Sequence, residues 1–223
     1  EIFLKRLADR EEEIYAQHAA GDPVEGLLFV GHKDRQLGLT ILSRLLLFHR
    51  MWSMNAVRGM SASVDPDKVM ELYDRDKVIL ENLPFYLRPT LGYDVKGQHI
   101  YFETSKSRML YQEASMKSGS GQGRQFDISH LTECASWDSI PGSSANIIEY
   151  YFFPTIPQSL RALCILESTA DGRGNWWHEF TERVRRGLVR RWRYVFIPYY
   201  MGISKYRAKP HPGWTPSELT QAH

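Results

Sequence analysis

Cysteine, net charge of either sign and long apolar runs are all scarce in this sequence, and each scarcity excludes a class of protein. The chain of 223 residues has two cysteines, Cys134 and Cys164. Two cysteines do not make a disulfide framework, and nothing resembles a secretory signal, so a reducing cytoplasm is the expected setting. The formal net charge of +2 is too small to indicate a nucleic-acid partner by itself. No apolar run approaches the roughly 20 residues of a membrane-spanning helix.

The remaining composition is that of a folded globular protein. Hydrophobic residues make up 43% of the chain and aromatic residues 13%, and this length suffices for one large domain with a substantial core. Neither end reads as a natural terminus, so we expect a domain excised from a longer protein.

Apolar and polar patterns alternate along the chain as strands and helices do in an α/β protein. The sequence predicts helices over residues 1–20, 40–54, 67–82 and 176–186, the last capped by Asn175. It predicts strands over residues 27–30, 99–103, 108–114, 126–131, 162–166 and 195–197. Segment 55–66 is polar and is expected to be mobile, and 118–124 reads as a flexible loop. The alternation favours an α/β layer fold with a mainly parallel sheet.

A candidate phosphate-binding loop, Lys33-Asp34-Arg35-Gln36-Leu37-Gly38-Leu39-Thr40, lies between an apolar strand pattern and an apolar helical pattern. Such a loop needs this context, because backbone N–H groups and the helix dipole converge on an anion. Gly38 lets the backbone approach a phosphate, and the Thr40 hydroxyl is a candidate Mg²⁺ ligand. Leu39 stands where the usual loop has Lys, so Lys33 and Arg35 are the candidate cations. A glycine turn before a helix is also a common structural feature, and both interpretations stay open here.

Glu133 follows the strand pattern that ends at Leu131-Thr132. A carboxylate at a strand end is what ATP hydrolysis needs, because it polarises the water that attacks the γ-phosphate in line. Taken alone, a glutamate in this position is more often an ordinary surface residue.

Two further polar segments are candidates for the same site. Ser168 and Thr169 follow a buried strand pattern, and α/β proteins bind ligands at the edge where parallel strands end. Ordinary Ser/Thr capping of a turn is the structural alternative. Arg124 ends a Gly/Ser-rich loop, from which an arginine can stabilise transition-state charge in a neighbouring subunit. The alternative for Arg124 is a solvated residue that keeps the loop soluble.

Together these segments resemble the ATPase domain of bacteriophage large terminases, the motors that pump viral DNA into capsids. The resemblance rests on the loop over 35–40, on His130-Leu131-Thr132-Glu133 followed by Ala135 and Trp137, and on the stretch from Glu167 to Asn175. It continues into Phe196-Ile197-Pro198-Tyr199-Tyr200 and Lys205-Tyr206. The motifs therefore cover residues 27–206 in the family's order.

The resemblance implies a P-loop NTPase of the additional-strand, catalytic-glutamate (ASCE) type over residues 1–206. It makes 33–40 the Walker A loop with its Lys at the front, Glu133 the catalytic carboxylate, Ser168-Thr169 the coupling motif, and Arg124 an arginine finger acting in trans. Residues 207–223 would be a linker towards a C-terminal nuclease domain that this sequence does not include, so no nuclease activity is expected.

The implied activity is hydrolysis of ATP with Mg²⁺, which drives double-stranded viral DNA into a procapsid. The implied partners are double-stranded DNA, the portal protein and the small terminase subunit. We expect a homo-oligomeric ring on the portal, a monomer in isolation, and a location in the bacterial host's cytoplasm. Two alternatives stay open: a helicase-like remodelling ATPase, and a nucleotide- or DNA-binding module without hydrolysis.

Two departures from the family pattern keep the non-hydrolysing alternative open. Walker B normally has Asp before the catalytic Glu, whereas this chain has Thr132, which leaves Thr40 as the one confident Mg²⁺ ligand. The adenine-reading Gln expected before Walker A is not evident. Gln17 is a candidate, but it is equally a helix-surface residue, and the family's Gln would otherwise precede Glu1.

A basic run near the C-terminal strand pattern allows two interpretations. It contains Arg183, Arg185, Arg186, Arg190, Arg191 and Arg193 around Trp192. These side chains would suit a DNA backbone, with Arg185, Arg186, Arg190 and Arg191 as the main candidates. The alternative is a solvated helix end, with Trp192 entering the next strand.

Overall fold

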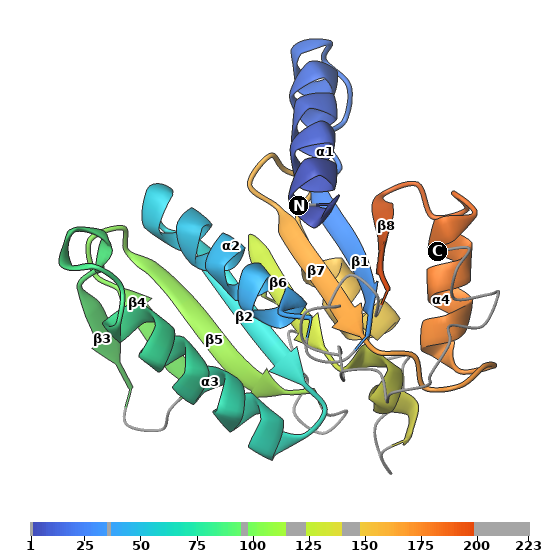
Figure 1. Ribbon diagram of the computed structural model, residues 1–223. Coiled ribbons are helices and arrows are strands. Elements are labelled where there is room, and N and C mark those ends of the chain that lie inside the picture. Colours follow the sequence, from blue (N-terminus) through green and yellow to red (C-terminus); the bar gives the residue numbers. More distant parts are fainter. Residues whose placement is uncertain (1, 35–36, 95–97, 115–123, 140–147, 199–223) are drawn as a thin grey trace, which may run out of the picture.

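A computed structural model describes residues 2–34, 37–94, 98–114, 124–139 and 148–198 (Figure 1). Its centre is an eight-stranded sheet in the order β3-β4-β5-β2-β6-β7-β1-β8. Every neighbouring pair from β5 to β8 is parallel, while β3 and β4 extend that sheet in antiparallel fashion. The strands are β1 (Leu27–Lys33), β2 (Arg58–Ser63), β3 (Leu91–Tyr93), β4 (His99–Phe102), β5 (Ser107–Glu113), β6 (Ile128–Thr132), β7 (Leu163–Ser168) and β8 (Trp192–Ile197).

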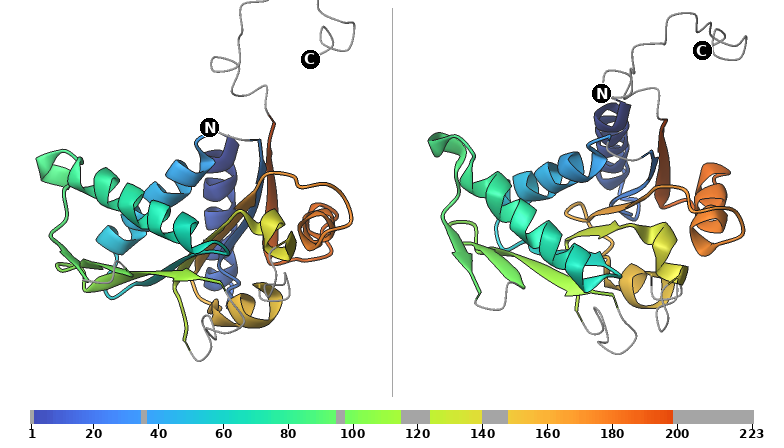
Figure 2. Two further views of the ribbon diagram at one scale, coloured as in Figure 1. Left: turned by 90° about the horizontal axis from the view of Figure 1, so that it is seen from below. Right: turned by 60° about the horizontal axis from the view of Figure 1, so that its bottom comes forward.

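Helices cover both faces of the sheet, as Figure 2 shows. One face carries α1 (Ile2–Ala19), α2 (Leu39–Ser53) and α3 (Pro66–Glu81). The other carries α4 (Trp176–Arg185) and the short helices η3 (Cys134–Ser139), η4 (Ile148–Phe152) and η5 (Phe153–Thr155), while η1 (Phe85–Leu87) follows α3. The α/β fold class predicted from the sequence is confirmed.

Successive side chains of the central strands enter two separate cores. In β1, Leu27 and Phe29 pack with α1, α2 and α3, whereas Leu28 and Val30 pack with α4 and the short helices. This follows from the alternation of side chains along a strand. A strand buried on both faces reads as a continuous apolar run, which explains why the sequence revealed β1 and β7.

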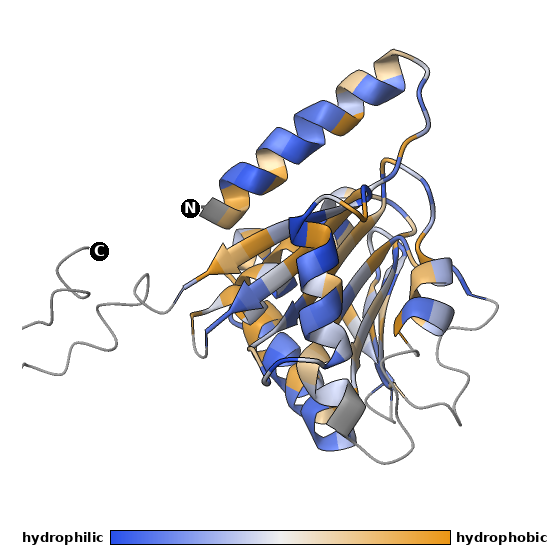
Figure 3. Cartoon of the chain, turned by 90° about the vertical axis from the view of Figure 1, so that its right-hand side faces the viewer, coloured by the Kyte–Doolittle hydropathy of each residue, from blue (hydrophilic) through white to orange (hydrophobic). Residues whose placement is uncertain are grey.

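The first helix, α1, contacts the rest of the molecule through a narrow stripe and projects beyond the sheet (Figure 3). Phe3, Arg10 and Ile14 are its buried residues, and most of its other side chains are exposed and hydrophilic. The spacing of this stripe is that of one helix face. In the ranges that the structure describes, no helix is both long and apolar enough to cross a membrane.

Most predicted elements are confirmed, with boundaries shifted by one to three residues. Asn175 caps α4 as predicted, accepting a hydrogen bond from the N–H of His178 at 2.9 Å. Trp192 begins β8, so its entry into the next strand, one of the two interpretations offered, is confirmed. The strand β3 and the short helices, which carry weak local signals, were not predicted.

The prediction that segment 55–66 is mobile is wrong, because it contains β2 at the centre of the sheet. Residues 59–63 of β2 are buried between β5 and β6. Crowding explains the small side chains: a Cβ on Gly59 would lie 2.9 Å from the Met109 side chain. Ser61 is polar but accepts a hydrogen bond from Arg44 at 2.9 Å. The small and hydroxyl side chains therefore give this buried strand the hydropathy of an exposed, polar segment.

Candidate nucleotide-binding site

The strand order brings the candidate segments to one edge of the sheet. The strand β7 lies between β1, which leads into the candidate loop, and β6, which leads to Glu133. Because all three strands are parallel, their C-terminal ends meet at the edge where α2 begins (Figure 1). This is the edge at which parallel α/β sheets bind ligands.

The loop between β1 and α2 ends in a left-handed glycine. Gly38 adopts the left-handed conformation, with φ 76°, immediately before the first residue of α2. Glycine adopts this conformation without strain, and the N-terminus of α2 then presents its free N–H groups. Asp34 and Leu37 flank the turn, and the predicted contacts Arg35 and Gln36 lie outside the described residues.

Lys33 and Leu39 lie in different surroundings, one at the N-terminus of α2 and the other in the core. The Lys33 ammonium donates a hydrogen bond to the Thr40 hydroxyl at 2.9 Å, so it reaches the N-terminus of α2 from the end of β1. Leu39, in the place of the usual Lys, is 1% exposed and packs against Gly31 in the core. Leu39→Ala is therefore expected to lower the free energy of unfolding by about 2–5 kcal/mol, the general cost of truncating a buried Leu.

Glu133 has an unusual backbone at the end of β6. Its φ is 56°, a left-handed conformation that costs a non-glycine residue roughly 1–2 kcal/mol. The turn is held by two bonds, from the Trp137 indole to the Thr132 carbonyl at 3.1 Å and from the Ser136 N–H to the Glu133 carbonyl at 2.9 Å. The Glu133 side chain is half-buried at the edge that holds the loop. Strain of this kind clusters at functional sites.

Ser168 connects the end of β7 to the segment that carries Glu133. Its hydroxyl accepts a hydrogen bond from the Ala135 N–H at 3.0 Å and is buried. A movement of β7 would therefore be transmitted to the residues after Glu133, which is the arrangement that a coupling motif needs. Thr169 follows Ser168 and is partly exposed at the same edge.

Glu167, for which the sequence pattern predicted no role, lies at the centre of the site. Its carboxylate is 0% exposed and accepts a hydrogen bond from the Thr132 hydroxyl at 3.2 Å. It also lies 3.3 Å from His130 Nε2 and 3.7 Å from Lys33 Nζ. Burial alone would raise the pKa of Glu167, but His130, Lys33 and Thr40 lower it to about 2. The carboxylate is therefore ionised at neutral pH.

A sequence signal for Glu167 did exist. It is the one carboxylate in β7, whose other residues are Leu163, Cys164, Ile165, Leu166 and Ser168. A carboxylate within a central, buried strand requires cationic or hydrogen-bonding partners. Only the fold shows that these partners come from β6 and from the loop.

His130 connects this site to a second buried cluster. Arg44 of α2 lies 3.3 Å from His130 Nδ1 and donates to Ser61. It also pairs with Asp76 of α3, which accepts from Arg44 Nε at 3.1 Å. Since Arg44 can only donate, Nδ1 is the acceptor and the imidazole proton is on Nε2, facing Glu167. Burial, assisted by Arg44, lowers the pKa of His130.

Arg124 lies at the opposite edge of the sheet from Glu133 in the same chain. It is exposed and precedes β6, whereas Glu133 follows β6. The structure therefore does not bring Arg124 to this chain's own site. The Gly/Ser residues 118–123 that precede Arg124 lie outside the described residues.

Gln17 is also distant from the loop. It lines a hollow with Asp22, Pro23 and Glu25, where β1 begins. The loop follows the other end of β1, and seven residues at about 3.3 Å each separate the two ends by roughly 20 Å. The structure therefore does not support the interpretation of Gln17 as the adenine-reading residue.

The basic run after α4 is largely occupied by acidic and carbonyl partners. Arg185 and Arg186 both contact Glu182, at 2.7 and 3.6 Å. Arg191 donates to the Glu25 carbonyl at 3.1 Å, while Arg190 is exposed. This pairing favours the solvated helix end over a surface prepared for DNA.

The oxygen atoms of the site fit a hard divalent cation, which prefers oxygen ligands. The Lys33 ammonium already stands as a cation beside the Thr40 hydroxyl and the Glu167 carboxylate. The buried Glu167 Oε2 accepts no hydrogen bond from the residues that the structure describes. A hydroxyl and a carboxylate oxygen therefore lie beside the same ammonium at the N-terminus of α2.

A parallel sheet with an extra strand between the loop strand and the glutamate strand defines the additional-strand class of P-loop NTPase folds. Within this class, comparison with solved structures shows that the fold is similar to that of phage large terminase ATPase domains. The large terminase ATPase domain of Thermus phage P74-26 matches with a TM-score of 0.62 and 14% identity, over 82% of this chain and 80% of that one.

Two longer structures agree with this match. The large terminase of bacteriophage HK97 gives a TM-score of 0.62 at 12% identity, over 76% of this chain and 35% of that one. A large terminase from a thermophilic bacteriophage, in complex with ADP, gives 0.60 at 11% identity, over 87% and 43%. The chain thus spans less than half of these two proteins.

Comparisons of the sequence itself find nothing: no family model matches, and no curated protein matches. The likeness at these identities is one of fold.

Proposed function

We propose that this chain is the ATP-hydrolysing domain of a motor that moves double-stranded viral DNA into a procapsid. The observation that carries the proposal is the placement of Lys33, Thr40 and Glu133 at one edge of the sheet, in a fold similar to that of a terminase ATPase domain. The ADP complex of a protein with this fold supports a nucleotide as the ligand.

The residues of the site suit hydrolysis of a phosphoanhydride. Lys33 and the N-terminal N–H groups of α2 bind the β- and γ-phosphates, since both present positive charge to an anion. Glu133 orients and polarises the attacking water and accepts its proton as the water oxygen bonds to the γ-phosphorus. The bond from the γ-phosphorus to the β,γ-bridging oxygen breaks, and ADP leaves with that oxygen. When bound, Mg²⁺ supplies charge neutralisation at the phosphates. Ser168 transmits the change at the γ-phosphate to β7 through its bond to Ala135.

A nucleotide-binding module without hydrolysis is the second candidate. Two observations favour it: Leu39 is buried in the core in place of a phosphate-binding Lys, and Thr132 occupies the position of the Walker B Asp. Release of inorganic phosphate from ATP by the purified chain separates the two candidates. A chain that binds ATP but releases no phosphate above a blank, both in isolation and after assembly on the portal, would establish the second.

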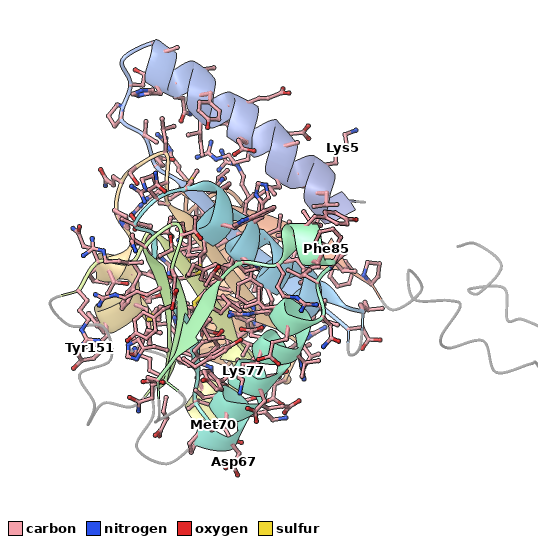
Figure 4. The ribbon with its side chains drawn as sticks, turned by 90° about the vertical axis from the view of Figure 1, so that its left-hand side faces the viewer. Lys5, Asp67, Met70, Lys77, Phe85 and Tyr151 are labelled. Atoms are coloured by element: carbon pink, nitrogen blue, oxygen red, sulfur yellow. The ribbon has the colours of Figure 1, made fainter. Side chains whose placement is uncertain are left out.

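The Lys33→Ala variant is expected to weaken ATP binding by about 10–100-fold, the general scale for losing a charge-assisted hydrogen bond. Titration calorimetry with ATP measures this change. The matched control is Lys5→Ala, which removes the same charge from the exposed face of α1 (Figure 4). Equal affinities of the two variants would exclude the loop as the phosphate site.

The Arg124→Ala variant tests whether the site is completed by a neighbour. We propose that the isolated chain is a monomer, that a ring forms on the portal, and that Arg124 then enters the adjacent subunit's site. Mixing Arg124→Ala with Glu133→Ala subunits under assembly conditions is expected to restore part of the turnover that each lacks. Interfaces that join an intact Glu133 site to an intact Arg124 neighbour produce this recovery.

Two results would contradict the trans role of Arg124. One is full activity of Arg124→Ala on its own. The other is a mixture as inactive as its components when light scattering confirms that it has assembled. Contacts with DNA, the portal and the small subunit belong to the same proposal, as does a location in the host cytoplasm.

A further inference from the structure

The carboxylate of Glu167 lies where the chain otherwise lacks an acid. On β6 the position before Glu133 is Thr132, whose hydroxyl donates to Glu167 Oε1 at 3.2 Å. In the sheet register, Thr132 and Glu167 are direct neighbours on β6 and β7. The side chain of Glu167 thus extends over Thr132 towards Lys33 and the start of α2.

We infer that Glu167 supplies the carboxylate that holds Mg²⁺ beside Thr40, in place of an acidic residue at position 132. This inference rests on the proposed function, because it concerns the metal that accompanies ATP. It assigns to β7, the strand inserted between the loop and the catalytic strand, a role in metal binding as well as in coupling.

The charge balance of the site supports this role. Glu167 is fully buried, and its Oε2 faces Lys33 Nζ at 3.7 Å without a hydrogen bond. A buried charge that loses its partner is strongly destabilising. When Lys33 turns to a bound phosphate, Glu167 keeps a compensating cation only if a metal ion takes the place of the ammonium. Lys33 is therefore the cation that pairs with Glu167 when no ATP and no metal are bound.

A purely structural ion pair would not need this arrangement. Thr132 donates a hydrogen bond to Oε1, and His130 Nε2 lies 3.3 Å from the same oxygen without a hydrogen bond. Oε2 is left without a donor, which is costly inside a protein. Here the unsatisfied oxygen is the one directed at the lysine that contacts Thr40. Glu167 Oε2 and the Thr40 hydroxyl, the two candidate metal ligands, thus both lie beside the Lys33 ammonium.

Binding of Mn²⁺ to the ATP-loaded chain tests the inference without measuring turnover. Free Mn²⁺ is quantified by electron paramagnetic resonance while the chain with ATP is titrated, and a titration of ATP alone is subtracted. Glu167→Gln is expected to lower Mn²⁺ affinity by about 10–100-fold, the scale for losing a partner of a metal site. Glu71→Gln, on the exposed surface of α3, removes the same charge and is expected to match the wild type.

A rescue variant separates metal binding from folding. In the double variant Thr132→Asp with Glu167→Gln, the carboxylate moves from β7 to its neighbour in register on β6, and most of the Mn²⁺ affinity is expected to return. Thermal melting of each variant shows whether it folds. If the single variant does not fold, Glu167→Asp replaces it, and its shorter side chain is expected to weaken Mn²⁺ binding.

The outcomes distinguish this inference from the function on which it rests. If the wild type does not bind ATP in titration calorimetry, the proposed function fails and the inference fails with it. If the wild type binds ATP and Mn²⁺ but the folded Glu167 variants bind Mn²⁺ equally well, the inference alone is overturned. Weaker Mn²⁺ binding that Thr132→Asp does not restore would make Glu167 a structural residue.

Discussion

Replacing Glu133 with glutamine is expected to lower ATP turnover by about 10²–10⁴-fold, the general scale for losing a positioned acid or base. The amide keeps the size of the side chain but cannot accept the proton of the attacking water. ATP affinity is expected to change little, because Glu133 acts on the transition state rather than on bound substrate. Phosphate release and titration calorimetry, performed on the same preparation, measure the two quantities.

A second substitution at Glu133 uses its backbone conformation. With φ 56°, Glu133→Gly is expected to raise the melting temperature, since glycine adopts this conformation without strain, while turnover is lost. A more stable but inactive variant is the signature of a residue kept for function. Turnover that survives in Glu133→Gln would assign the chemistry to another carboxylate, and Glu71→Gln controls for the change of charge.

The parts of the fold that the sequence revealed are those with a local signal. The strand at the loop, the helix after it and the central strand before Ser168 all carry continuous or periodic apolar patterns, so their order predicted an α/β protein. The placement of Lys33, Gly38 and Glu133 at one edge then follows from parallel strands. The roles of these residues stay predictions until the variants are measured.

The parts that the sequence did not reveal depend on neighbours distant in the chain. The strand β2 reads as polar because crowding by Met109 and the bond to Arg44 select small residues, and neither cause is visible locally. Glu167 reads as the beginning of a polar turn, although its partners lie on β6 and at the end of β1. The interpretation of Gln17 as the adenine-reading residue is not supported for a related reason. Its position before β1 in the sequence does not show which end of β1 it lies beside.

The buried ion pair between Arg44 and Asp76 is a further feature of this kind, and its disruption is expected to have the largest effect on stability. Both side chains are fully buried. The Arg44 guanidinium contacts Asp76, Ser61, His130 and Tyr111, and the Tyr111 hydroxyl donates to Asp76. Burial lowers the pKa of Arg44, but the neighbouring Asp76 carboxylate raises it by more, so the pKa lies above its ordinary value. The guanidinium therefore stays charged in the core.

Asp76→Ala is expected to lower the free energy of unfolding by about 3–5 kcal/mol, because it leaves the Arg44 charge buried without a counter-ion. Urea denaturation followed by circular dichroism measures this loss. The matched control is Glu71→Ala, which breaks the exposed pair of Glu71 with Arg75 on the same helix and is expected to cost at most about 1 kcal/mol. Equal losses in the two variants would show that the Arg44 charge is compensated in another way.

Replacing both partners by apolar residues shows whether stability depends on the two charges or only on the volume that the two side chains fill. Arg44→Met combined with Asp76→Leu removes the buried charges together, so this double variant is expected to be more stable than Asp76→Ala. It also removes the contact of Arg44 with His130 Nδ1, and His130 in turn lies beside Glu167. A double variant that folds well but binds Mn²⁺ with ATP more weakly would show that the cluster serves to position His130 and Glu167. Unchanged Mn²⁺ binding would confine the role of the cluster to attaching α2 and α3 to the sheet.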